Sequence, residues 1–499
     1  MSGEPYVDSR ETHSGCVVLL GDLAYKVKKP VDLGFLDYTS RDARVSICHR
    51  EVELNSRLAP DVYLGVGGIE VAGRPTEPVV VMRRMPEEAR LSRLVEEGRT
   101  TPTLMRDLAR TVAVFHSRAE RSEAVSAEGT RGAITRRWEA NLSQSRLLRP
   151  TVLEGAVLAE IESLVHDFLV GREPLFDERI AHRRIVDGHG DLIAQDIFCQ
   201  PDGVRILDCL EFDDRLRYVD QLDDVAFLAM DLEQLGAPGL STALLAAYVD
   251  FANDPAPPGL LHHFMAYRAF VRAKVSALRW SQGGGAGSDA AADARRFSDL
   301  AVRHLREGVV CLVLVGGPPG SGKTTLAGDL ADRFGMVVLS SDRIRKELAG
   351  LDPSSSAAAA YEQGIYQPAW TDRTYTELLR RAELMLQRGE SVILDASWTV
   401  RARRGAAEDL ASTNAARLVQ LQCSLDEETA AERIRVRSGV SDADPGIAST
   451  LRRAAGAWPG SVAIDTSRSR GAATEDAARA IRPPVRGLAG HIRSKMAPD

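Results

Sequence analysis

The chain has 499 residues, a formal net charge of −7 and 44% hydrophobic residues. Its length predicts two to four domains, because single cores rarely exceed about 250–300 residues. This composition excludes extensive disorder, and the acidic balance argues against nucleic acid as a partner. No signal peptide or apolar run of about 18 residues is evident, and the six scattered cysteines are typical of reduced thiols. We therefore expect a cytoplasmic protein with no membrane partner.

The segment 1–85 predicts a small β-rich lobe with one helix. Apolar residues at 16–20 and 23–28 flank a Gly21-Asp22 turn, which is typical of a hairpin. One helix and two further strands are expected, at 40–58, 63–71 and 79–82.

The segment 86–307 predicts a mainly helical lobe. Helical patterns occur at 91–117, 136–169, 225–232, 260–278 and 289–306. Short strands are expected at 185–187, 197–198 and 204–207. The helix over 260–278 carries Arg268, Arg272 and Lys274. We interpret these as a solvated basic face, with contact to an acceptor or a phosphate as the alternative.

Acidic residues are concentrated between Asp191 and Asp224, where ten carboxylates occur in 34 residues. Oxygen ligands of this kind suit Mg²⁺, so their density predicts a divalent-metal site.

The motif His189-Gly190-Asp191-Leu192 resembles the signature of aminoglycoside phosphotransferases and related small-molecule kinases with a protein-kinase-like fold. The resemblance implies that Asp191 is the catalytic aspartate, which orients the acceptor hydroxyl. It also implies that Asp208, after a short apolar strand, links Mg²⁺ to the phosphates of ATP.

The strand that contains Lys26 resembles the lysine strand of such kinases, in which the lysine contacts the nucleotide. Glu51 would be its ion-pair partner. Lys28 is an alternative to Lys26, because both side chains project from one face of the strand. Asp196 occupies the position of the family's metal-binding asparagine, and its carboxylate also suits Mg²⁺. This replacement of the family's asparagine by Asp196 is compatible with either a catalytic or a non-catalytic N-terminal half.

The strongest motif follows an apolar strand at 309–315 and precedes a helical pattern. It matches G-x4-G-K-[ST], whose backbone N–H groups cradle the phosphates of ATP. Lys323 supplies charge to the outer phosphates, and the Thr324 hydroxyl can bind Mg²⁺. The expected nucleotide-binding residues are Gly317, Pro318, Pro319, Gly320, Ser321, Gly322, Lys323, Thr324 and Thr325.

The segment 308–482 alternates strands with helices, which predicts a doubly wound parallel sheet. Its later strands are expected at 336–339, 391–395, 418–421 and 462–466, and 483–499 is a tail. Asp395 ends one strand and is a candidate for the Walker-B role beside Mg²⁺.

Asp342 lies just after another strand end, so it is a candidate base for an acceptor hydroxyl; the alternative is a helix N-cap. With Arg345 it resembles the D-x-x-R motif of a P-loop kinase group, in which the arginine grips the acceptor. Arg433 and Arg437 lie one helical turn apart and resemble the arginine-bearing lid of small P-loop kinases. A basic helix end that interacts with the helix dipole is the alternative.

The chain as a whole resembles a bacterial family that fuses an aminoglycoside-phosphotransferase-like domain to a P-loop kinase domain. We therefore expect an α/β and α+β fold with a bilobal kinase-like domain followed by a P-loop domain. The resemblance implies an ATP- and Mg²⁺-dependent phosphotransferase acting on a hydroxyl group of a small molecule. A nucleotide-gated regulatory protein and a polynucleotide 5′-hydroxyl kinase are alternatives. The acceptor and the oligomeric state stay open.

Overall fold

The computed structural model describes residues 7–11, 15–32, 36–70, 75–148, 152–282, 288–352, 364–436 and 457–481. Two compact units contain them. The first consists of Met1–Val165, Phe176–Ala256 and Leu260–Gly308, and the second of His166–Leu175, Pro257–Gly259 and Val309–Asp499. None of the helices in these ranges is long and apolar enough to cross a bilayer.

The first unit begins with a five-stranded antiparallel sheet in the order β1-β2-β3-β5-β4. Its strands are β1 (Val7–Glu11), β2 (Gly15–Leu20), β3 (Leu23–Lys28), β4 (Tyr63–Ile69) and β5 (Glu77–Arg83). Helix α1 (Arg41–Asn55) begins where the Ser40 side chain accepts a hydrogen bond from the N–H of Ala43. Buried Cys48 and Val80 join helix and sheet in one core. The predicted hairpin, helix and two strands are therefore confirmed.

Strand β1 has no counterpart in the predicted elements. Four of its five residues are exposed and only Val7 is strongly apolar, so no alternating pattern marks it. It forms because the edge of β2 offers unpaired backbone groups, with which β1 pairs from Val7 opposite Leu20 to Glu11 opposite Cys16.

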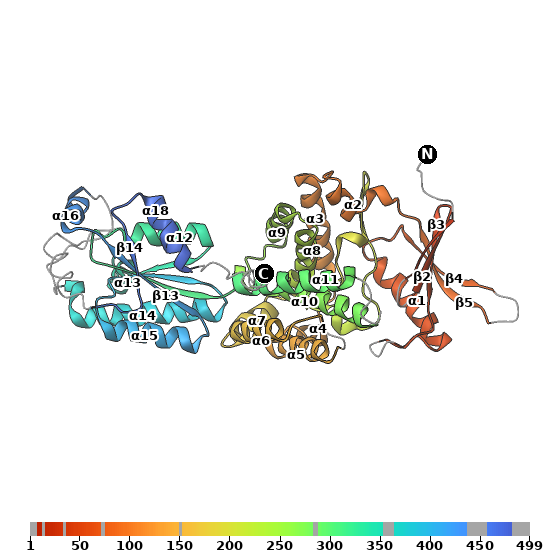
Figure 1. Ribbon diagram of the computed structural model, residues 1–499, viewed down its shortest axis with the longest axis horizontal. Coiled ribbons are helices and arrows are strands. Elements are labelled where there is room, and N and C mark those ends of the chain that lie inside the picture. Colours follow the sequence, from red (N-terminus) through yellow and green to blue (C-terminus); the bar gives the residue numbers. More distant parts are fainter. Residues whose placement is uncertain are drawn as a thin grey trace, which may run out of the picture. The chain divides into compact units, whose positions relative to one another are not determined.

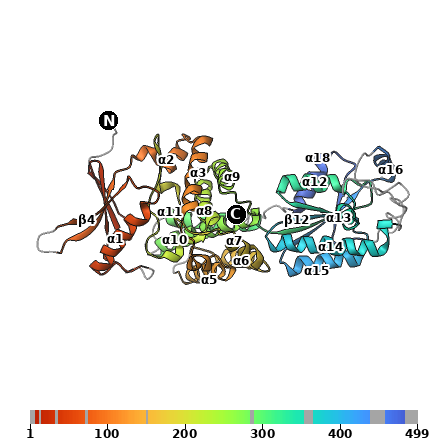
Figure 2. The same ribbon diagram turned by 180° about the vertical axis from the view of Figure 1, so that it is seen from behind.

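A helical lobe follows in the same unit. Its helices are α2 (Leu91–Glu96), α3 (Pro102–Arg118), α4 (Glu123–Ala127), α5 (Arg131–Leu147), α6 (Gly155–Leu169), α7 (Glu173–Ala181), α8 (Gln221–Gln234), α9 (Pro238–Ala252), α10 (Pro258–Gln282) and α11 (Ser288–Glu307). Two short antiparallel pairs interrupt them, β6 (Ile185–Asp187) with β9 (Tyr218–Asp220) and β7 (Ile197–Gln200) with β8 (Gly203–Ile206). Helix α8 is buried along nearly its whole length, and α3 and α9 lie beside it (Figures 1 and 2).

The interpretation of the 260–278 helix as a solvated basic face is wrong for Arg268. This side chain is only 5% exposed, and its guanidinium donates two hydrogen bonds to Asp223, at 2.8 and 2.9 Å. The charge is buried because α8 places a carboxylate opposite it, a partner that the sequence of α10 alone does not show.

The second unit contains a five-stranded parallel sheet in the order β11-β12-β10-β13-β14, which confirms the predicted doubly wound arrangement. The strands are β10 (Cys311–Gly316), β11 (Val337–Ser340), β12 (Val392–Asp395), β13 (Arg417–Ser424) and β14 (Val462–Asp465). The helices are α12 (Lys323–Phe334), α13 (Ser341–Leu348), α14 (Pro368–Gln387), α15 (Arg401–Thr413), α16 (Glu427–Val436) and α18 (Arg470–Ile481). Helices α12 and α18 cover one face of the sheet, and α14 and α15 the other (Figure 1). The predicted tail lies outside the described residues.

A buried ion-pair network joins α7 to the start of α8. Arg179 donates to both oxygens of Asp220, at 2.6 and 2.7 Å, and also to Asp254. All three residues are at most 6% exposed. Arg179→Leu leaves two carboxylates buried without this cation, so we expect the free energy of unfolding of the first unit to fall by about 3–5 kcal/mol. Urea unfolding, followed by hydrogen exchange of peptides from this unit, measures the change.

Arg146→Leu is the matched control, because it removes an exposed pair with Glu162 in the same unit. We expect it to lower the free energy of unfolding by no more than about 1 kcal/mol. Equal losses in the two variants would contradict a special contribution from the buried network.

Candidate functional sites

The glycine-rich loop between β10 and α12 is shaped by three glycines. Gly317, Gly320 and Gly322 have φ angles of 147°, 80° and 81°, which side chains disfavour. A Cβ on Gly317 would also lie 2.9 Å from the Cys423 carbonyl oxygen. The loop delivers Lys323 as the first residue of α12, where the helix N-terminus favours an anion.

Thr324 and Asp395 meet below this loop. The Thr324 hydroxyl donates a 2.8 Å hydrogen bond to Oδ2 of Asp395, which is 3% exposed. Parallel pairing places Asp395 beside Val315 on one side and Ser340 on the other, so three strands end at the same level. The structure therefore brings together the hydroxyl and the carboxylate proposed from the sequence.

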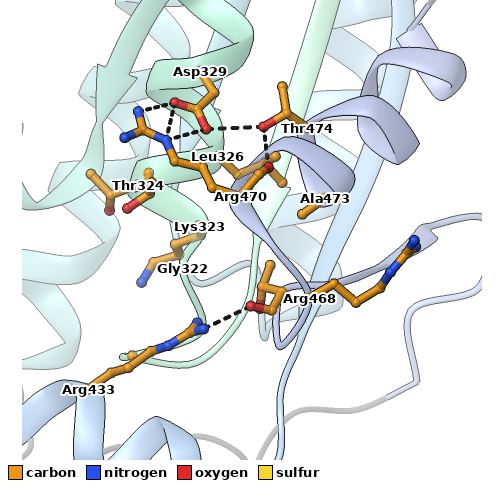
Figure 3. Close-up of a pocket in the computed structure, with 13 residues that line it drawn as sticks. Gly322, Lys323, Thr324, Leu326, Asp329, Arg433, Arg468, Arg470, Ala473 and Thr474 are labelled. Carbon is orange, nitrogen blue, oxygen red and sulfur yellow. Dashed lines mark hydrogen bonds and ion pairs between the residues drawn. The ribbon is translucent and has the colours of Figure 1, made fainter.

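A pocket of about 420 Å³ opens at this loop (Figure 3). Lys323, Thr324 and Arg433 all line it, although Arg433 comes from α16, more than 100 residues later. Arg433 donates a 3.0 Å hydrogen bond to the Thr466 carbonyl, which holds its guanidinium at the loop. Arg437 lies outside the described residues.

Two further arginines line the pocket but are already paired. Arg470 binds Asp329 (Figure 3). Arg468 lies 2.6 Å from Asp476. The sequence analysis missed both, since an arginine after a strand has no distinctive spacing. The pocket wall therefore carries four cationic side chains, counting Lys323 and Arg433.

Asp342 lies in the first turn of α13, and the N-cap position belongs to Ser340, so the N-cap alternative for Asp342 is wrong. The Tyr366 hydroxyl donates a 3.2 Å hydrogen bond to Asp342, and the buried Lys346 ammonium is 3.7 Å from it. Asp342 follows Ser340, which pairs with Asp395, so its backbone starts at the edge of the sheet where the glycine-rich loop lies.

Arg345 is 7% exposed and directed into α14 and its preceding turn. It donates to the Ile365 carbonyl at 2.9 Å and to the Thr371 hydroxyl at 3.0 Å. Burial lowers the pKa of its guanidinium. Both of these partners are structural, so an acceptor would have to displace them to reach this side chain.

In the first unit, Lys26 lies between two carboxylates. Its ammonium is 2.7 Å from Glu51 and 2.5 Å from Asp208. Lys28 contacts the other Glu51 oxygen at 2.7 Å and Glu211 at 2.6 Å. The two lysines therefore share Glu51, but only Lys26 has Asp208 among its ion-pair partners. This contact places the Lys26 ammonium, rather than that of Lys28, beside the Asp208 carboxylate.

The Asp208 backbone has a φ of 63°, an uncommon conformation outside glycine. Its N–H donates a 3.2 Å hydrogen bond to the Tyr63 hydroxyl, which helps to hold the turn. Partial desolvation of a side chain that is still 48% exposed would raise the pKa of Asp208, but the ion pair with Lys26 outweighs this effect and lowers it. Asp208 is therefore fixed as an anion at the junction of the two lobes.

Asp224 organises the turn that carries the His-Gly-Asp motif. Its two oxygens accept hydrogen bonds from the N–H groups of His189 and Gly190, at 2.7 and 2.9 Å. His116 Nε2 lies 3.0 Å from the same carboxylate. Burial opposes ionisation of Asp224, but the His116 hydrogen bond lowers its pKa below the ordinary range. The sequence analysis gave Asp224 no separate role, and nothing local in the sequence around His116 indicates this contact.

Three carboxylates near the motif interact electrostatically. Burial raises the pKa of Asp191 to about 6, Asp208 adds to the increase, and Arg272 opposes it. The pKa of Asp196 rises further, because burial acts together with repulsion from Asp208 and Asp191. This mutual repulsion is what a divalent cation would relieve, so the oxygen ligands of Asp196 and Asp208 fit Mg²⁺. The Thr324–Asp395 pair forms a second set of oxygen ligands that fits the same ion.

The raised pKa of Asp191 predicts a pH-dependent stability. Its folded-state value of about 6 exceeds the ordinary value of 3.8, so protonation stabilises the folded chain at low pH, and this stabilisation is lost as the pH rises through 6. Asp191→Asn cannot ionise. We expect it to be more stable than the wild type at pH 8, by at most about 3 kcal/mol, and the difference to shrink towards pH 5. Denaturant unfolding at several pH values tests this, and a pH-independent difference would contradict it.

Comparisons with known proteins give matches to the whole chain and to parts of it. A family model described as an AAA domain matches residues 312–454. The protein Rv2004c of Mycobacterium tuberculosis is 43% identical over 94% of each chain, and an adenylate kinase of Renibacterium salmoninarum is 33% identical over 26% of this chain and 70% of its own. A solved choline/ethanolamine kinase family protein from Mesorhizobium loti is 14% identical, with a TM-score of 0.38, over 61% of this chain and 92% of its own. The chain belongs to the same family as the mycobacterial protein, and its second unit carries a P-loop kinase domain.

Proposed function

We propose that the chain is an ATP- and Mg²⁺-dependent phosphotransferase with two sites, each transferring the γ-phosphate of ATP to a hydroxyl group of a small molecule. The observation that carries the proposal is the Thr324–Asp395 hydrogen bond beneath a glycine-rich loop. This combination provides a phosphate cradle and a set of metal ligands at one point. The similarity to an adenylate kinase supports phosphoryl transfer at this loop.

At the P-loop site, Lys323 would bind the outer phosphates and Arg433 would approach the transferred group from α16. The cationic side chains act where negative charge develops in the transition state. Asp342 would accept the proton of the acceptor hydroxyl, and its hydrogen bond from Tyr366 would orient the carboxylate. When bound, Mg²⁺ would offset phosphate charge beside Thr324 and Asp395.

At the second site, Lys26 would bind the phosphates, held in place by Glu51. Asp191 would accept the acceptor proton, and its pKa of about 6 leaves it largely ionised at neutral pH. Its position depends on Asp224, which holds the backbone of the two preceding residues. The carboxylates of Asp196 and Asp208 would hold the cation.

The first test counts nucleotide sites in the full chain. We expect a fluorescent ATP analogue to bind with two equivalents to the wild type and with one equivalent to Lys323→Ala or Lys26→Ala, because each variant removes the phosphate-binding cation of one site. Arg333→Ala is the matched control. It changes an exposed cation paired with Glu475 at the other end of α12 and should keep both equivalents. Two equivalents in the Lys323→Ala variant would refute the P-loop assignment.

The second test assigns turnover to each aspartate. In a Lys26→Ala background, Asp342→Asn should lower the transfer of γ-labelled phosphate to small hydroxyl compounds by about 10²–10⁴-fold, with ATP affinity unchanged. In a Lys323→Ala background, Asp191→Asn should do the same for the other site. If Asp191→Asn leaves transfer unchanged, the first unit is not a kinase. If label reaches only the 5′ ends of oligonucleotides, the small-molecule assignment is wrong.

A further inference from the structure

Two histidines and a glutamate meet on α10 and α11, apart from the residues assigned to either nucleotide site. His262 Nδ1 lies 3.0 Å from His304 Nδ1. Oε2 of Glu307 lies 3.7 Å from the first nitrogen and 3.9 Å from the second. The two helices run side by side in both views (Figures 1 and 2). Three potential metal ligands thus share one small volume.

The three separations match the dimensions of a zinc site. Atoms at these distances lie on a circle with a radius of about 2.1 Å, which is the length of Zn–N and Zn–O bonds in proteins. A point at the centre of this circle is therefore at bonding distance from all three atoms. Small side-chain rotations would move the ligands from this plane towards a tetrahedral arrangement.

A further carboxylate prepares His304 for metal binding. Glu233, on α8, lies 3.2 Å from His304 Nε2 and also accepts a hydrogen bond from Arg303. In the metal-bound form, Nε2 of His304 would carry the proton that faces Glu233, and Nδ1 would be unprotonated and able to bind the ion. His304 is 1% exposed, whereas the side chains of His262 and Glu307 are 25% and 35% exposed. The open side of the cluster leaves room for water as a fourth ligand.

We propose that His262 Nδ1, His304 Nδ1 and Glu307 Oε2 bind one Zn²⁺ ion, with water in the remaining position. Two neutral imidazoles and one carboxylate carry a single negative charge, so the ion is attracted without the repulsion of an acidic cluster. The bound ion would link the start of α10 to the end of α11. It would thereby brace the helix that leads directly into β10.

The proposal is tested on the full chain without an affinity tag, after chelation and in excess Mg²⁺, which occupies the oxygen-only sites. We expect Zn²⁺ to bind with one equivalent in calorimetry and to raise the melting temperature. Co²⁺ in its place should give the visible bands of a nitrogen- and oxygen-bound ion without thiolate absorption, which separates this site from the six cysteines.

Glu307→Gln is the main variant, because its exposed side chain can change without unfolding the lobe. It and His262→Ala should each weaken Zn²⁺ binding by more than about tenfold, and Glu233→Gln, which removes the outer carboxylate, by about 10- to 100-fold. His49→Ala, an exposed histidine on α1, is the matched control and should bind as the wild type does. If the wild type binds no Zn²⁺, or if Glu307→Gln and His262→Ala both bind it unchanged, the short nitrogen contact is only a hydrogen bond between two imidazoles and the proposal fails.

Discussion

The second unit depends on the register of its parallel sheet. Val315, Asp395 and Ser340 are paired across three neighbouring strands. The loop after β10, the Asp395 carboxylate at the end of β12 and the start of α13 therefore lie at the same edge of the sheet. A shift of one residue in β12 would turn Asp395 to the opposite face of the sheet and break its hydrogen bond to Thr324. The glycine-rich loop gives the site its shape, whereas the strand pairing positions Asp395, the second potential metal ligand beside Thr324.

The first unit, by contrast, has to hold many carboxylates close together. It does so by giving most buried carboxylates a dedicated partner: Asp224 has His116 and two backbone N–H groups, Asp223 has Arg268, and Asp220 has Arg179. Burial raises the pKa values of Asp191 and Asp196, and it also raises that of Asp223 despite its Arg268 partner.

The elements of both units were largely predictable from sequence, since long periodic helices and apolar strands carry their own signals. The positions of Thr324 and Asp395 were predictable too, because Thr324 belongs to the strand-loop-helix motif and Asp395 ends an apolar strand. The roles of Asp224, His116 and Arg268 were not, since each depends on a partner more than 30 residues away. Arg345 illustrates the converse: a motif suggested ligand contact, whereas tertiary packing gives its guanidinium structural partners.

The left-handed backbone at Asp208 limits which residues this position can accept during evolution. Asparagine and aspartate tolerate that conformation better than other residues with a side chain, and only glycine is freer. Glycine would relax the backbone but discard the carboxylate, while glutamate would keep the charge in an unfavourable conformation. Under the proposed function, a lineage that no longer transfers phosphate at the second site could exchange Asp208 for asparagine or glycine and keep the backbone turn. On the same proposal, the residue at position 208 would distinguish family members that are active at this site from those that have lost the activity.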